Sequence, residues 1–161
     1  MTSSNGYSET QKDTISTLNS LIETSKDGES GFRDAARHAH APDLRALLTS
    51  YSADCGRSAV ELGDCVTGLG GKPETSGTAV GALHRGWVNL KASLNSDDDL
   101  MLLEECERGE DHAKAAYSKA MATTLTPTVQ TLLKRQWDGT VVHHDRIRDL
   151  RNRGRAAAAA N

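Results

Sequence analysis

The side chains best suited to chemistry in this sequence are three glutamates and a histidine: Glu29, Glu107, Glu110 and His144. Carboxylate and imidazole groups are common protein ligands of iron, manganese and zinc. Glu107 and Glu110 are three residues apart, which puts both on one side of a helix, where they can bind a cation together. The residue types therefore predict a metal site for Fe, Mn or Zn that uses some of these four side chains.

Two other interpretations of the same residues stay open. A buried carboxylate must be paired, protonated or metal-bound, so Glu110 and His144 can also form a hydrogen-bonded pair without any metal. Alternatively, the side chains face solvent. We expect this for most of the acidic run at residues 104–111, including Glu105.

Apolar side chains recur every three or four residues along four long segments, which predicts four helices. Ser8 and Gln11 have the capping-box spacing that begins the first helix, and Pro42 follows its end. The second helix should end at residues 70–73, Gly-Gly-Lys-Pro, because glycine adopts the left-handed cap conformation and proline cannot continue a helix. Thr126 and Pro127 should open the last helix.

The third helix carries an interruption at Asn95–Asp99, before which Trp87 lies on a first apolar segment and Ser96 is a candidate cap. Short connections favour helices that alternate in direction. The sequence thus predicts an all-α, antiparallel four-helix bundle over residues 8–155 with a broken or kinked third helix and flexible ends at 1–7 and 156–161. Extending each apolar stripe places these polar residues inward at mid-helix: Glu29, Cys55, Ser58, Glu110, Thr140 and His144.

Composition narrows the possible partners. Aromatic residues make up only 4% of the chain, which disfavours a sheet, and a net charge of −3 gives no reason to expect nucleic acid as a partner. No apolar stretch is long enough to span a membrane, and the first residues lack a basic, then apolar, leader, so we expect a cytoplasmic protein without a membrane partner. Three cysteines cannot all pair within one chain, and we expect them to be buried thiols: Cys55, Cys65 and Cys106.

Four segments carry a resemblance to known proteins: residues 18–32, 81–87, 104–111 and 144–146. Together they resemble a family of uncharacterised bacterial four-helix-bundle proteins, described as ferritin-like and without a known function, over about Leu18 to Leu150. The resemblance implies a ferritin-like fold, distantly similar to bacterioferritin and rubrerythrin, and a stress-related or housekeeping role. It brings no catalytic residue with it.

Ferritin-like di-metal sites take one Glu from each of two helices and a Glu-x-x-His motif from each of the other two. In this sequence no Glu precedes a His by three residues, which disfavours a full di-iron site and an oxidase. One metal held by Glu110, His144 and another carboxylate remains open. We expect a non-enzymatic, self-associating stress-related or interaction protein; the alternative is a metal-binding protein with storage or oxidase chemistry. A homodimer is expected, with Trp87 offered to the second chain.

Overall fold

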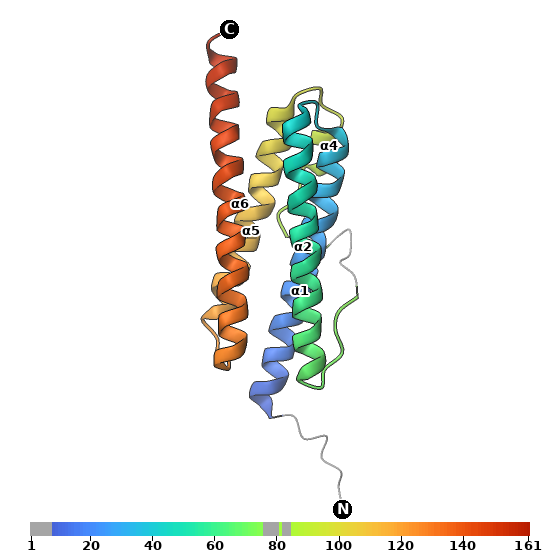
Figure 1. The fold of residues 1–161 in the computed structure, drawn as a ribbon, viewed down its shortest axis with the longest axis vertical. Coiled ribbons are helices and arrows are strands. Elements are labelled where there is room, and N and C mark those ends of the chain that lie inside the picture. The colour runs from blue at the N-terminus through green and yellow to red at the C-terminus, as the bar shows by residue number, and fades with distance from the viewer. Residues whose placement is uncertain (1–7, 76–80, 82–84) are drawn as a thin grey trace, which may run out of the picture.

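The computed structural model describes residues 8–75, 81 and 85–161. All regular secondary structure in this part of the chain is helical (Figure 1). The helices are α1 (Glu9–His38), α2 (Pro42–Gly68), α4 (Leu90–Leu94), α5 (Asp99–Met121) and α6 (Pro127–Ala159). Within the described ranges, no helix is long and apolar enough to cross a membrane. Residues 1–7, including Tyr7, lie outside the described residues. At the other end of the chain, α6 continues as a helix through Ala156–Ala159.

The ends of the helices follow from local sequence. The Ser8 hydroxyl accepts a hydrogen bond from the Gln11 amide at 3.1 Å, as the cap of α1 requires. The Gln11 side chain does not return to Ser8; it donates to the Leu69 carbonyl at 2.7 Å and ties the start of α1 to the end of α2. Gly70 has φ +83° just past α2, and the Thr126 hydroxyl caps α6, so both predicted boundaries are confirmed.

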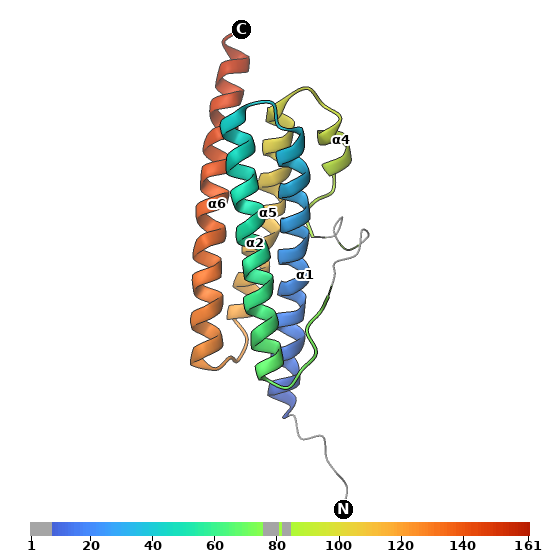
Figure 2. The ribbon, with the colours of Figure 1, turned by 45° about the vertical axis from the view of Figure 1, so that its right-hand side comes forward.

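The connection between α2 and α5 differs from the expected alternation of helix direction. The Asp99 carboxylate, at the first residue of α5, accepts hydrogen bonds from the backbone amides of His40 and Ala41 at 2.8 and 3.0 Å. Because these two residues form the turn from α1 to α2, α2 and α5 start at the same end of the bundle and run in the same direction (Figures 1 and 2). The chain returns along the length of the bundle between them, so each helix is still antiparallel to its packed neighbours.

The third helix is broken at residues 95–98, where the interruption was predicted, but the segment before the break is shorter than expected. Its first part is only the five-residue α4, and Trp87 precedes that helix in an irregular segment. The cap of α5 is Asp98, whose carboxylate accepts from the Leu100 amide at 2.9 Å, whereas the Ser96 hydroxyl accepts from the Asp98 amide. An aspartate at this position also suits the positive end of the helix dipole.

Trp87 is buried inside the chain, with only 4% of its surface exposed. Its indole meets the Phe32 ring edge-on at 5.3 Å between ring centroids. It fits notches in α1 and α5 where Gly31 and Gly109 lack a side chain; a β-carbon on Gly31 would lie 2.7 Å from the ring. The expectation that Trp87 contacts a second chain is therefore wrong, and the homodimer remains a prediction.

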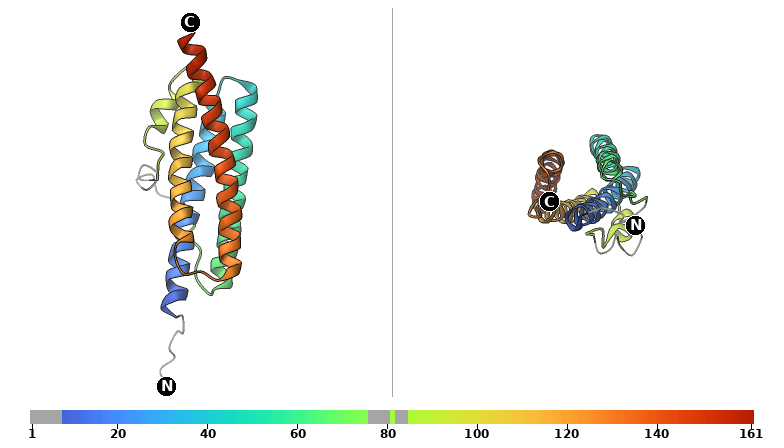
Figure 3. Two further views of the ribbon diagram at one scale, coloured as in Figure 1. Left: turned by 90° about the vertical axis from the view of Figure 1, so that its left-hand side faces the viewer. Right: turned by 90° about the horizontal axis from the view of Figure 1, so that it is seen from below.

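The buried apolar side chains form two clusters, one toward each end of the bundle. One contains Phe32, Leu48, Trp87, Leu102 and Ile147 with their neighbours, and the other contains Leu18, Ile22, Leu62, Tyr117 and Leu133 with theirs. Each long helix contributes residues to both clusters, so its middle residues lie between them. α1 packs on α2 and on α5, and α5 packs on α6, while α2 and α6 touch sparingly (Figure 3).

Candidate functional site

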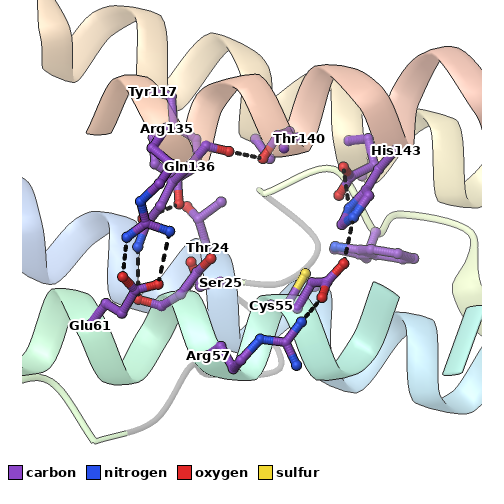
Figure 4. A pocket seen from close by; sticks show the side chains of 18 residues that line it. Thr24, Ser25, Cys55, Arg57, Glu61, Tyr117, Arg135, Gln136, Thr140 and His143 are labelled. Atoms are coloured by element: carbon purple, nitrogen blue, oxygen red, sulfur yellow. Dashed lines mark hydrogen bonds and ion pairs between the residues drawn. The ribbon is translucent and has the colours of Figure 1, made fainter. Parts of the chain in front are cut away.

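A cavity of about 180 Å³ lies at mid-helix, between the two apolar clusters. Side chains from all four long helices line it, and Figure 4 shows those of α6 facing those of α2 across it. Its polar lining includes Ser25, Cys55, Ser58, Glu110, Tyr117, Gln136, Thr140 and His143. The sequence prediction that polar mid-helix residues meet at one level of the bundle is confirmed for Cys55, Ser58, Glu110 and Thr140.

The cavity meets the surface between α2 and α6, where charged side chains of the two helices pair. Arg135 of α6 forms an ion pair with Glu61 of α2, and Arg57 forms one with Asp54 (Figure 4). The ring of His143 donates from Nε2 to the Asp54 carboxylate at 2.9 Å, because a carboxylate can only accept. These polar contacts join α2 and α6 where apolar packing between them is sparse.

Glu110 lies on the inner side of His143, with 2% of its surface exposed. Its Oε2 atom is 3.6 Å from His143 Nδ1 and has no hydrogen-bond partner among the described residues. The His143 ring is held in place by stacking on Tyr51, with ring centroids 3.8 Å apart. Burial raises the pKa of Glu110, and the neighbouring His143 opposes this shift without cancelling it.

The sequence predicts His144 as the partner of Glu110. In the structure, the histidine that faces Glu110 is His143. Successive residues on a helix point about 100° apart, so the two histidines face different neighbours. His143 faces the cavity, whereas His144 faces α5, where its Nε2 lies 2.7 Å from Asp111 Oδ1 and 3.8 Å from Glu107 Oε1. Glu110 and His144 are both buried, as expected, but they belong to two different clusters.

The second cluster consists of Glu107, Asp111 and His144, between α5 and α6. One ligand atom from each of these residues lies within 4.8 Å of the others. Nδ1 of His144 lies 3.1 Å from the Asp145 carboxylate, and the Arg151 guanidinium pairs with the second oxygen of Glu107. The imidazole is thus oriented by a carboxylate on one nitrogen, with two more carboxylates at the other.

Two further expectations about carboxylates need correction. Glu29 is only half-buried and its carboxylate lies against α2, where a β-carbon on Gly56 would be 3.2 Å away; it does not line the cavity. The acidic run on α5 is not a solvated face, because Glu105, Glu107 and Glu110 are all buried. The Glu105 carboxylate accepts from the Asn89 amide at 2.9 Å and pairs with Arg108.

The three cysteines are free thiols, as expected, but only Cys106 belongs to the buried residues, and Cys55 and Cys65 are half-buried. Burial raises the pKa of the Cys55 thiol well above its ordinary value, and the nearby carboxylates of Glu110 and Glu29 add to the shift. Burial likewise raises the pKa of Cys106. Because the thiolate is the reactive form, neither thiol has the properties of a nucleophile.

Sequence reasoning missed the roles of Asp111, His143 and Asp54. Asp111 is four residues after Glu107, a spacing that puts the two on one face of a helix as surely as the spacing of Glu107 and Glu110. His143 lies off the apolar stripe that contains His144, so periodicity alone did not direct it inward. The pairing of Asp54 with His143 joins residues 89 positions apart and leaves no local signal.

The central cavity does not match the ligand set of a ferritin-like di-metal site. Such a site needs a carboxylate from each helix and two histidines. Here α1 contributes Ser25 to the cavity, α2 contributes Cys55 and Ser58, and Glu110 is the one buried carboxylate among the described lining residues. We therefore derive no oxidase chemistry at the bundle centre.

Comparisons with solved structures show the fold. A mutant of Dps1 from Mycobacterium smegmatis matches with a TM-score of 0.75 and 13% identity, over 91% of this chain and 99% of the Dps1 chain. A two-domain protein from Anabaena variabilis, with DJ-1/ThiJ/PfpI-like and ferritin-like domains, matches with a TM-score of 0.71 and 15% identity, over 98% of this chain. This chain spans 40% of that protein's length.

No curated protein matches this sequence. A family model does: the domain of unknown function DUF2383 matches residues 13–123, which include most of α1 and all of α2, α4 and α5. The match covers more than half of the chain, and the observed bundle has the ferritin-like fold implied by the sequence resemblance. The chain therefore belongs to the DUF2383 family, and its own structure is a ferritin-like four-helix bundle with a broken third helix.

Proposed function

We propose that this ferritin-like bundle binds one divalent transition-metal ion between α5 and α6, with Glu107, Asp111 and His144 as ligands. The observation that carries the proposal is the convergence of two carboxylates and one imidazole within 4.8 Å. Glu107 and Asp111 are one helical turn apart on α5, and His144 reaches them from α6. A cation at this point relieves the repulsion between neighbouring carboxylates.

The surroundings of the three residues support binding over an ordinary surface cluster. His144 and Glu107 are 5% and 8% exposed, so two of the ligands are fixed by packing. The Asp145 carboxylate orients the His144 ring from Nδ1, an arrangement common for metal-binding histidines. Arg151 pairs with one Glu107 oxygen and leaves the other facing His144.

The ligand set suits Fe, Mn or Zn. Three protein ligands leave at least one coordination position for water, an arrangement compatible with metal storage or transfer. Of the four predicted metal ligands, Glu107 and His144 belong to this cluster, while Glu29 and Glu110 lie elsewhere. The proposal is thus the metal-binding alternative drawn from the sequence, with one mononuclear site and a different ligand set.

Equilibrium dialysis against Zn²⁺ or Mn²⁺ tests this function, after purification without chelator and removal of bound metal. We expect about one ion per chain for the wild type and at least a tenfold loss of affinity for His144→Gln. The control is His40→Gln, since His40 has a 58% exposed side chain that contacts Asp99 at the start of α5 and none of the three proposed ligands. Equal affinities for the wild type and His144→Gln would refute the site.

A second candidate is a non-enzymatic, self-associating protein located in the cytoplasm. It is supported by two large apolar side chains that are exposed on the helices flanking the cavity mouth, Val60 of α2 at 64% and Val142 of α6 at 65%. Sedimentation equilibrium of the wild type and of Val142→Glu tests it. We expect a dimer that the charged side chain weakens; a wild-type monomer at all concentrations would remove the candidate.

A further inference from the structure

The central cavity contains a buried carboxylate oxygen with no hydrogen-bond partner among the described residues. This atom is Glu110 Oε2, and its closest basic group, His143 Nδ1, is 3.6 Å away, beyond hydrogen-bond length. Glu110 is 2% exposed and lines the cavity. A buried carboxylate without a donor is costly, so the cavity is suited to a ligand that supplies one.

Several other donors of the described lining already have partners. The two guanidinium groups, of Arg57 and Arg135, pair with carboxylates at the mouth. The Tyr117 hydroxyl donates to Gln136 Oε1 at 2.8 Å, and the Gln136 amide donates to the Ser58 carbonyl at 3.3 Å. No described donor bonds Glu110 Oε2, so a ligand that brings its own donor can pair with it, and a positive charge makes that contact strongest.

The remaining surface of the cavity suits a short apolar body. Trp87, Ala113 and the two glycines Gly28 and Gly109 contribute to its lining. Its volume of about 180 Å³ is slightly larger than an engineered cavity of ~150 Å³ that holds benzene, so it can accept a ligand of about six non-hydrogen atoms. The aromatic rings of Trp87 and Tyr117 can also attract a cation.

We propose that the central cavity binds a small primary alkylammonium ion, with its ammonium group on Glu110 and its alkyl chain against the apolar lining. This site is separate from the proposed metal site: it uses the cavity side of α6, where His143 lies, and none of the three metal ligands. At the mouth, Arg57 and Arg135 balance the charges of Asp54 and Glu61, so the preference for a cation comes from Glu110.

Isothermal titration with three probes of nearly equal length tests the proposal: pentylamine, 1-pentanol and pentanoate, in the presence of a chelator that excludes metal. We expect saturable one-to-one binding of pentylamine, at least tenfold weaker binding of pentanol, and no binding of pentanoate. The neutral alcohol controls for the apolar contacts, and the anion controls for the sign of the charge. Failure of pentylamine to bind, or equal binding of amine and alcohol, would overturn the proposal.

Variants locate the site. Glu110→Gln keeps the size of the side chain and removes its charge, so we expect it to lower pentylamine affinity at least tenfold while pentanol affinity changes little. Glu104→Gln, on the outer side of the same helix, should leave both unchanged. Ala113→Leu, which fills the cavity, should abolish binding of both probes. Helical circular dichroism checks that each variant is folded; pentylamine binding to folded Glu110→Gln at wild-type affinity would refute the assignment.

Discussion

Oε2 of Glu110 and Nδ1 of His143 face each other at 3.6 Å on the inner side of the cavity, too far apart for a hydrogen bond. We expect Glu110→Ala to destabilise the protein by about 1–3 kcal/mol, because it enlarges the cavity and removes the neighbour of a buried imidazole. Glu110→Gln should cost less than about 1 kcal/mol, since it keeps the volume and removes a charge that is costly to bury. Urea midpoints at pH 7 measure both, and equal large losses would contradict this account.

The raised pKa of Glu110 sets a pH dependence. The native protein holds the proton of this carboxyl more tightly than the unfolded chain, whose value is near 4.5. The stabilisation from this group is therefore complete below pH 4.5 and is lost as the pH rises through the native pKa. We expect the wild type to gain stability relative to Glu110→Gln on acidification over this range. A difference in unfolding free energy between the two proteins that does not change with pH would exclude this effect.

Asp99 should show the opposite slope. Burial alone would raise its pKa, but hydrogen bonds from the His40 and Ala41 amides lower it below its ordinary value near 3.8. Its contribution is present above pH 3.8 and is lost as the pH falls through the native pKa. We expect Asp99→Ala to cost about 1.5–3 kcal/mol at pH 7 and much less near pH 2. Asp97→Ala, an exposed control, should stay within about 0.5 kcal/mol.

The stability cost of removing Glu105 distinguishes the observed structure from the expectation that the acidic run is solvated. Glu105→Ala leaves the Asn89 amide without its acceptor and should cost about 1–3 kcal/mol. Glu104 has a 38% exposed side chain that pairs with Arg155, so Glu104→Ala should cost no more than about 1 kcal/mol. Urea unfolding at neutral pH compares them, and indistinguishable midpoints would place Glu105 on the surface.

Alanine substitutions at two helical glycines test how closely Trp87 packs against α5. A β-carbon on Gly109 overlaps the indole, and Gly109→Ala should therefore destabilise the protein by about 1–3 kcal/mol. At Gly139 no atom lies within 4 Å of such a carbon, so Gly139→Ala should stabilise α6 by about 0.5–1 kcal/mol. Thermal unfolding should shift in opposite directions for the two variants.

Local signals were enough to predict the four long helices. Ser8 and Thr126 cap their helices as expected, because a cap depends on residues within one turn. The direction of α5 was not predictable in this way, since it depends on the contact of Asp99 with the turn at His40. The separation between these residues is 59 positions, and no local pattern reveals it.

The site was predictable only in part, for a similar reason. Periodicity correctly placed Glu110 and His144 in the interior, but it does not say which helix each one faces. A rotation of about 100° per residue decides that His143 meets Glu110 and His144 meets Asp111. The sequence did not reveal that Trp87 is buried within its own chain, because its pocket depends on two glycines on other segments, Gly31 and Gly109.

The uneven packing of the bundle has a mechanical consequence. α1 with α2, and α5 with α6, form two helical hairpins that meet mainly along α1 and α5, while α2 and α6 are joined by polar contacts such as that of Asp54 with His143. The two hairpins therefore have their main line of contact along α1 and α5, and the opposite edge of the bundle, at α2 and α6, is less closely packed. A small rotation about the line of contact between α1 and α5 would separate α2 from α6, break the polar contacts between them and the stacking of Tyr51 on His143, and open the cavity while both hairpins stay intact.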